Sequence, residues 1–117
     1  MNQSLLTGIM EFNLFGMPYI GADICGFIFN TTEEMCNRWM QLGSFYPFSR
    51  NHNIYDAFDQ DPGVWPAVAD ASRRSLMIRY RLLPYLYTLF HLSHTTGVHF
   101  INFNKFNIYL NLIDKYY

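Results

Sequence analysis

Two short apolar runs alternate with two helical segments along this chain. After an entry loop that starts near residue 12, residues 19–24 read YIGADI, and residues 44–51 read SFYPFSRN. Runs of this kind are typical of strands buried on both faces of a parallel sheet. A strand–helix–strand–helix order predicts an α/β fold. Because two strands cannot complete a parallel sheet, we expect the chain to be part of a larger fold.

The first helical segment lies within NTTEEMCNRWMQL, residues 30–42. Thr31 and Glu34 have the spacing of a capping box, in which the threonine oxygen accepts an amide hydrogen and the glutamate reaches back. Met35, Trp39 and Leu42 recur at helical spacing. We therefore expect these three side chains to form one buried apolar stripe.

The second helical segment is long. It begins near Pro66 and runs to about Thr95, and Gly97 is its stop signal. Pro84 lies inside it and is expected to kink the helix or to divide it in two. The apolar face of this helix is expected to contain Leu76, Tyr80, Leu83 and Tyr87.

The low fraction of charged residues also indicates that the chain is part of a larger fold. Only 15% of the residues are charged and 50% are hydrophobic, whereas about 25% of residues are charged in a typical soluble domain. A net charge of −1 gives no basic face, which argues against a nucleic-acid partner. No apolar run approaches the roughly 20 residues that cross a bilayer, and no signal peptide is visible in the opening MNQSLLTG. We expect no direct membrane contact from this segment.

Polar side chains follow both strand candidates. Asp23 lies at the end of the first, and Arg50 and His52 lie just past the end of the second. In a (β/α)8 barrel the active residues gather where strands end, so parallel neighbours would bring these groups to one rim. From the residues alone, an aspartate such as Asp23 in an apolar strand is more often a hydrogen-bonded structural acid, and a histidine such as His52 after a strand is usually an ordinary polar loop residue.

The two cysteines leave a similar choice open. Cys25 and Cys36 can form one disulfide or remain two buried thiols. No His or Cys pair has the spacing of a zinc finger, so the pattern does not predict a metal site.

Three stretches together resemble glycoside hydrolase family 31: EFNLFGMPYIGADICGF, NTTEEMCNRWMQLGSFYPFSRNHN and RYRLLPYLYTLFHLSHTTG. The resemblance covers roughly residues 8–98 and is strongest to the animal secretory α-glucosidases, such as the lysosomal and intestinal enzymes. It implies a (β/α)8 TIM barrel, of which this chain would supply about strands 7 and 8 with their helices. Residues 1–99 would then be a partial catalytic barrel.

The resemblance also implies an activity. The parent enzyme would be a retaining α-glucosidase that hydrolyses terminal α-linked glucose from oligosaccharides or glycogen, without a metal or organic cofactor. In the family both catalytic aspartates precede the region present in this chain, so the chain alone is expected to be inactive. Two alternatives stay open: another specificity of the same family, such as α-xylosidase, and a non-catalytic carbohydrate-binding or inactive truncated product.

Four residues match family positions around the sugar. Asp23 and His52 match groups that hydrogen-bond hydroxyls of the glucose unit at the cleavage point, and both side chains have the donors or acceptors for this. Phe27 matches an aromatic wall of the pocket, and Arg50 matches a cation that holds a carboxylate in place. The resemblance therefore implies substrate-binding roles for these four residues and a catalytic role for none.

The secretory features are also implied by the resemblance. Cys25 and Cys36 match a family disulfide, which needs an oxidising compartment. Asn30 and Asn2 begin N-glycosylation sequons, and Asn30 agrees with a family glycan position. We therefore expect the secretory pathway, whether lysosome, cell surface or extracellular space.

Residues 100–117 differ from the rest in composition. Fifteen of these eighteen residues are Phe, Ile, Asn, Lys or Tyr, and the segment has no Gly, Ala or Pro. All five amino acids can be encoded by A/T-only codons, so we interpret the tail as translated non-coding sequence. A lineage-specific strand or helix is the alternative, and a spliced coding exon over this segment in the transcript would support it.

Overall fold

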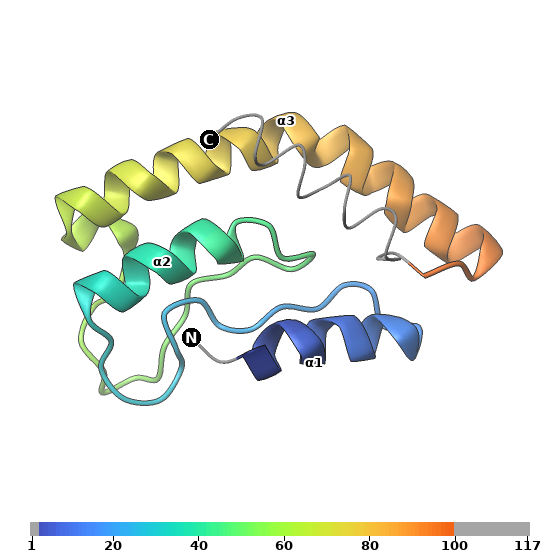
Figure 1. The fold of residues 1–117 in the computed structure, drawn as a ribbon. Helices are drawn as coiled ribbons and strands as arrows, with labels where there is room; N and C mark the ends of the chain where they lie inside the picture. Colours follow the sequence, from blue (N-terminus) through green and yellow to red (C-terminus); the bar gives the residue numbers. More distant parts are fainter. Residues whose placement is uncertain (1–2, 100–117) are drawn as a thin grey trace.

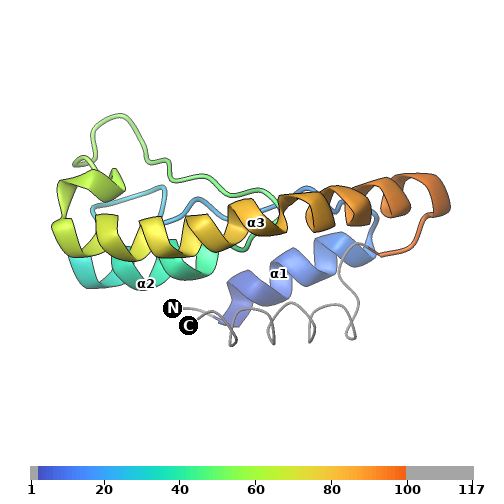
Figure 2. The ribbon, with the colours of Figure 1, turned by 90° about the horizontal axis from the view of Figure 1, so that it is seen from above.

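The computed structural model describes residues 3–99, and the atypical tail lies outside them. The helices are α1 (Gln3–Leu14), α2 (Glu33–Gly43), the 3₁₀ helix η1 (Pro62–Val64) and α3 (Pro66–Thr96). Figure 1 shows α3 arching over the molecule, with α2 under its first half and α1 on the same side further along. The view from above in Figure 2 agrees, and α2 packs directly against α3. None of the helices described is long and apolar enough to span a membrane.

The two apolar runs lie side by side but do not form strands within residues 3–99. Ile24 and Asn51 form one isolated parallel bridge, and the amide of Ile24 donates to the carbonyl of Arg50 at 2.9 Å. The parallel direction agrees with the prediction, but the two strands themselves are not present. A strand buried in a parallel sheet has a neighbour on each side, and among the residues described each run has only the other.

The second run also starts later than predicted. Ser44 and Tyr46 donate backbone hydrogen bonds back to Met40 and Gly43, so the chain continues to turn after α2. The amide of Phe48 then donates to the carbonyl of Ile20 at 3.2 Å. Glycine is required opposite this contact, because a Cβ at Gly21 would lie 1.8 Å from the Phe48 carbonyl oxygen.

No sequence pattern predicts α1. The segment QSLLTGIMEFNL has no acidic residue in its first turn and no basic residue in its last turn. Ile9 and Asn13 are nevertheless buried. Their burial depends on the segments packed against α1, and the periodicity of the helix does not reveal it.

The cap of α2 is Thr32 rather than Thr31. The Thr32 hydroxyl accepts a hydrogen bond from the amide of Met35 at 3.3 Å, and Thr32 has the extended backbone of an N-cap residue. This shift by one residue places Met35 where a capping box needs Glu or Gln, so the predicted box does not form. Glu34 instead forms an ion pair with Arg38, one turn further along, at 2.6 Å.

The buried face of α2 is also shifted by one residue from the prediction. Cys36, Met40 and Gly43 are buried, whereas Met35 is 47% exposed. Trp39 and Leu42 are partly buried against the same core. The shift follows from close packing at the end of the helix, where a Cβ on Gly43 would lie 2.4 Å from the Ile24 side chain.

The bounds of α3 agree with the prediction. Pro66 occupies its first turn, and Gly97 ends it in the left-handed conformation at φ 68°. Pro84 does not divide the helix, which runs as one curved element in Figure 1.

The predicted apolar face of α3 is wrong. Tyr80 and Tyr87 are 67% and 76% exposed, and Leu83 is also exposed. The buried face instead combines small and aliphatic residues: Val68, Ala71, Ser72, Ser75, Ile78, Leu82, Leu86 and Leu89. Large apolar residues recur at helical spacing on both the predicted and the buried face, and the small residues in the first half of the buried face give no apolar signal, so the pattern does not distinguish the two faces.

A compact core joins α1, α2, α3 and the two apolar runs. Its buried members are Ile9, Ile24, Cys25, Cys36, Met40, Tyr46 and Val68. Burial raises the pKa of the Tyr46 hydroxyl, whereas the hydrogen bond from Trp39 Nε1 at 3.2 Å lowers it. The guanidinium of Arg79 ties α3 to the turn after α2, donating to the carbonyl oxygens of Ser44 (2.8 Å), Tyr46 (2.6 Å) and Pro47 (3.2 Å).

The position of the cap predicts which threonine stabilises α2. Thr32→Ala is expected to lower the free energy of unfolding of the 117-residue chain by about 1 kcal/mol, because one first-turn amide loses its acceptor. Thr31→Ala is the matched control and is expected to have little effect. Urea titration followed by circular dichroism measures both. A larger loss for Thr31→Ala than for Thr32→Ala would contradict the assignment of the cap.

Candidate functional site

The end of the first apolar run and the end of the second meet at a charged pair. Arg50 Nε and Nη2 both donate to Asp23 Oδ1, at 2.9 and 2.5 Å. The Asp23 side chain is 23% exposed and that of Arg50 is 49% exposed. Asp23 Oδ2 has no hydrogen-bond partner among the residues described. The carboxylate is therefore held through one oxygen and has the other free to accept a hydrogen bond.

Arg50 is itself oriented by an aromatic ring. Its guanidinium carbon lies 5.3 Å from the centroid of the Phe48 ring, within the range of a cation–π contact. Phe48 is in turn fixed by its backbone bond to Ile20. The cation that contacts Asp23 thus belongs to the second run, one residue before Asn51, which bridges to Ile24.

Phe27 and His52 form a second contact between the same two segments. Their ring centroids are 5.7 Å apart, with the planes tilted by 30°, and both side chains are exposed. The carbonyl of Phe27 accepts a hydrogen bond from the amide of Ile54 at 2.9 Å. The four predicted sugar-contact residues therefore form two contacting pairs, and each pair has one member from either segment.

The loop between Asp23 and Phe27 is tightly turned. The amide of Gly26 donates to the carbonyl of Asp23 at 3.0 Å, and both Cys25 and Gly26 have left-handed backbone, at φ 73° and 96°. Glycine adopts this conformation without cost, but for a residue such as cysteine it costs on the order of 1 kcal/mol. The surrounding contacts must therefore hold Cys25 in place.

One of those contacts is a disulfide. Cys25 and Cys36 are bonded, with their Cα atoms 4.7 Å apart, and both residues are buried. The bond attaches the loop that contains Asp23 and Phe27 to α2. The structure thus joins the two cysteines whose pairing the sequence resemblance implies.

Two amide side chains add a second restraint that sequence reasoning does not identify. Gln60 Nε2 donates to the carbonyl oxygens of Ile24 (3.2 Å) and Gly26 (3.0 Å) and lies 3.0 Å from Asn51 Oδ1. Asn51 Nδ2 donates to the carbonyl of Gln60 at 2.8 Å. Nothing in the sequence around Gln60 signals this role, because the residue lies between two exposed aspartates in an irregular segment.

Asn30, the predicted glycosylation residue, lies at the far end of the same loop. It is exposed, and its Oδ1 accepts a hydrogen bond from the amide of Phe58 at 2.8 Å. Its Nδ2, the atom that would bear a glycan, has no partner among the residues described. The side chain is therefore oriented with its reactive nitrogen free.

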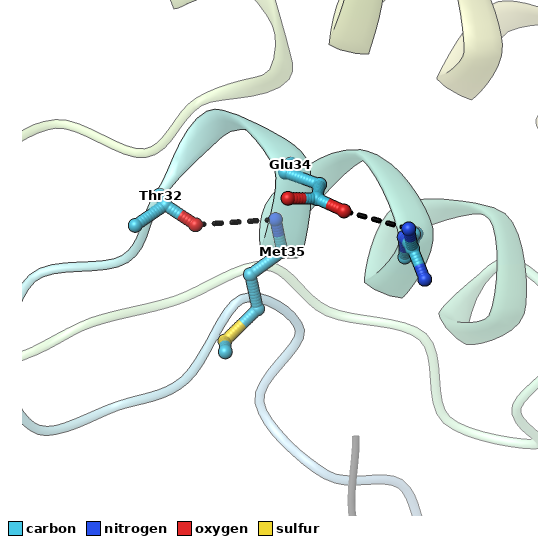
Figure 3. Close-up of a pocket in the computed structure, with 4 residues that line it drawn as sticks. Thr32, Glu34 and Met35 are labelled. Atoms are coloured by element: carbon cyan, nitrogen blue, oxygen red, sulfur yellow. Dashed lines mark hydrogen bonds and ion pairs between the residues drawn. The ribbon is translucent and has the colours of Figure 1, made fainter.

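A separate hollow of about 230 Å³ lies at the start of α2, lined by Thr32, Glu34, Met35 and Arg38. Figure 3 shows that its polar groups are engaged: Thr32 with the amide of Met35, and Glu34 in its ion pair. None of the predicted sugar-contact residues lines it. Across residues 3–99 there is also no cluster of three or more His, Cys, Asp or Glu side chains that would suit a metal ion.

Comparison with known proteins identifies the family to which the segment with these loops is similar. Residues 1–89 match the family model described as glycosyl hydrolases family 31, TIM-barrel domain. The chain is 58% identical over 92 residues to an α-glucosidase of Aspergillus oryzae, covering 79% of this chain and 9% of that protein. It is 57% identical over 95 residues to human intestinal sucrase-isomaltase, covering 79% of this chain and 5% of that protein.

Solved structures agree with the sequence comparison. The α subunit of glucosidase II, in its Glc1Man2-bound form, matches with a TM-score of 0.70 and 36% identity, over 77% of this chain and 10% of that chain. The chain therefore spans a tenth or less of the length of these relatives.

Proposed function

The chain belongs to glycosyl hydrolase family 31, and on that premise we propose that it supplies one side of the sugar pocket of a retaining α-glucosidase. The observation that carries this proposal is the Asp23 carboxylate, which is held by Arg50 through Oδ1 and whose Oδ2 has no hydrogen-bond partner within residues 3–99. It lies in a segment 58% identical to a fungal α-glucosidase. The contact between Phe27 and His52 beside it supports the same role.

The chemistry of these groups suits a glucose unit. Asp23 Oδ2 can accept hydrogen bonds from sugar hydroxyls, and the ring nitrogens of His52 can donate or accept. The exposed face of Phe27 is apolar and suits the C–H face of a sugar ring. Arg50 orients the Asp23 carboxylate through two hydrogen bonds, so that the carboxylate does not have to reorganise when the sugar binds.

These residues would bind the sugar, and the bond-breaking groups would lie elsewhere in the enzyme. A retaining glycosidase uses two carboxyl groups about 5–5.5 Å apart, one as nucleophile and one as acid and then base. We assign neither role to Asp23, whose Oδ1 is occupied by Arg50. Hydrogen bonds to sugar hydroxyls can strengthen in the oxocarbenium-like transition state, and Asp23 and His52 would assist the rate in this way.

Residues 1–99 would form about the seventh and eighth strand–helix units of the barrel. The parallel bridge between Ile24 and Asn51 supports this, because it gives the two runs the direction that neighbouring barrel strands have. In the full barrel each run would gain a neighbour on its other side, and the single bridge would extend into a ladder. The predicted strands would then form only in that context.

The disulfide and the glycosylation sequon support the interpretation of this chain as part of a secretory protein. The Cys25–Cys36 disulfide needs an oxidising compartment, and Asn30 begins an exposed sequon with its Nδ2 free. We therefore propose a lysosomal, cell-surface or extracellular enzyme that has a glycan at Asn30.

A segment exchange tests the proposed function. In the Aspergillus oryzae α-glucosidase, the matching 92-residue stretch is replaced by that of this chain; this protein is called the chimera below. We expect the chimera to hydrolyse maltose and p-nitrophenyl α-glucoside, and the 117-residue chain alone to hydrolyse neither. A folded chimera without α-glucosidase activity would contradict the proposal, and a preference for p-nitrophenyl α-xyloside would favour the α-xylosidase alternative.

A further inference from the structure

Gln60 is buried in a place where a polar side chain is expected to be exposed. It is 4% exposed, although it belongs to an irregular segment between Asn51 and η1, and such segments usually run over the surface. Both of its sequence neighbours, Asp59 and Asp61, are exposed. A buried amide is tolerated when its polar atoms are hydrogen-bonded, so its partners indicate why it is there.

Those partners come from both segments of the candidate site. The amide nitrogen of Gln60 lies within 3.2 Å of three acceptors: the carbonyls of Ile24 and Gly26 and the side-chain oxygen of Asn51. Its own carbonyl accepts from Asn51 Nδ2. Gln60 thus contacts the loop before Phe27 and the residue before His52 at the same time.

The two carbonyls that Gln60 binds flank Cys25, which has left-handed backbone. The disulfide restrains the side chain of Cys25, whereas Gln60 restrains the peptide group that joins Ile24 to Cys25 and the one that follows Gly26. Both restraints are needed to fix the direction in which the loop leaves Asp23 and reaches Phe27. Without the amide, the backbone of Cys25 would be free to relax out of its unfavourable conformation.

We propose that Gln60, paired with Asn51, is a positioning residue for the sugar site. It fixes the loop of residues 24–27 so that Asp23 meets Arg50 and Phe27 meets His52. The positioning of the loop stands on the structure alone, and its consequence for sugar hydrolysis rests on the proposed function.

The first test measures the loop directly in the 117-residue chain. Gln60→Met keeps the length of the side chain and removes its hydrogen bonds. The amides of Ile24 and Ile54, which donate to Arg50 and Phe27, are expected to exchange with solvent about tenfold faster. The amide of Ala69, in the first turn of α3, is expected to keep its exchange rate.

Gln41→Met is the matched control. Gln41 is a half-buried glutamine, and among the residues described its amide nitrogen donates to Asn37 within α2. Its replacement is expected to leave the exchange of Ile24 and Ile54 unchanged. If Gln60→Met does not fold, Gln60→Asn keeps the amide and shortens its reach by one methylene, and the same readout applies.

The second test measures the consequence for hydrolysis in the chimera. Gln60→Met is expected to lower kcat/KM for p-nitrophenyl α-glucoside by about 10–100-fold, because small displacements of binding groups have effects of this size. The inhibition constant for glucose is expected to rise in parallel, while Gln41→Met changes neither. A merely stabilising residue would lower the melting temperature and leave both constants unchanged at temperatures where the chimera is folded.

The outcomes separate the two proposals. Unchanged exchange at Ile24 and Ile54 overturns the positioning role, whatever the chimera does. Faster exchange with unchanged kcat/KM and glucose inhibition overturns the link between the loop and the sugar site. If the unmodified chimera folds but is inactive, the proposed function fails, and the exchange experiment still decides whether Gln60 positions the loop.

Discussion

Asp23→Asn in the chimera is expected to lower kcat/KM for α-glucosides by about 100-fold or more. Hydrogen bonds to a charged group contribute about 1.5–3 kcal/mol each, and a carboxylate can accept from two hydroxyls of one sugar. Since about 1.4 kcal/mol corresponds to a factor of ten in rate, the loss of the charge alone accounts for an effect of this size. Asparagine keeps the shape of the side chain, so the effect reports on charge and hydrogen bonding.

The same substitution also disturbs the pair with Arg50. If the asparagine turns its amide nitrogen toward the guanidinium, two hydrogen-bond donors face each other. If it turns its oxygen toward the guanidinium, the hydrogen bond remains but the ion pair is lost. Steady-state kinetics on p-nitrophenyl α-glucoside measures the effect. A decrease of less than about threefold, far below the value of one charged hydrogen bond, would contradict a sugar-binding role for Asp23.

Asp70→Asn is the control for this experiment. Asp70 lies on the exposed side of α3, where it pairs with Arg73 and Arg74. Exposed pairs of this kind contribute little to stability, and the residue is far along the chain from the site loops. We expect its replacement to leave kcat/KM unchanged, so an equal decrease in both variants would show a general effect of removing an aspartate.

Removal of the disulfide is expected to have the largest effect on stability. The double variant Cys25→Ala/Cys36→Ala should lower the free energy of unfolding of the 117-residue chain by about 3 kcal/mol. The bond closes a loop with a sequence separation of 11, and loops of roughly this length give values of this size in the chain-entropy model. The loop around Cys25 also loses one of the two restraints on its left-handed backbone.

Urea unfolding under oxidising conditions measures this difference. The unsubstituted chain in the presence of a thiol reductant serves as the control, because reduction removes the same bond without changing the side-chain volume. A loss below about 1 kcal/mol in the double variant would mean that the bond does not constrain the unfolded chain as expected.

Much of the surface is apolar for a chain of this size. Large side chains on α3 and in the site loops are exposed, among them Met77, Tyr80, Tyr87, Phe29 and Tyr55. This exposure agrees with the low fraction of charged residues and with the small share of each relative that the chain covers. All three observations are expected of a segment that packs against other parts of a larger domain.

Features that depend on a few neighbouring residues could be predicted from the sequence. The start of α3 at Pro66 and its end at Gly97 follow from the restricted backbone of proline and the freedom of glycine. The parallel direction of the two apolar runs was also predicted. Asp23, Arg50 and His52 were identified as site candidates from their positions after the runs, and Phe27 through resemblance to a family. Their roles toward a sugar remain predictions.

The remaining features were decided by tertiary structure. The buried face of α3, the restraint by Gln60 and the three carbonyls bound by Arg79 depend on segments 30 or so residues apart that approach in space. Periodicity reports which residues share a face of one helix, but it does not say which face a partner covers. Hydrogen bonds from buried polar side chains form wherever a donor meets an unpaired carbonyl, and only the folded chain determines where that is.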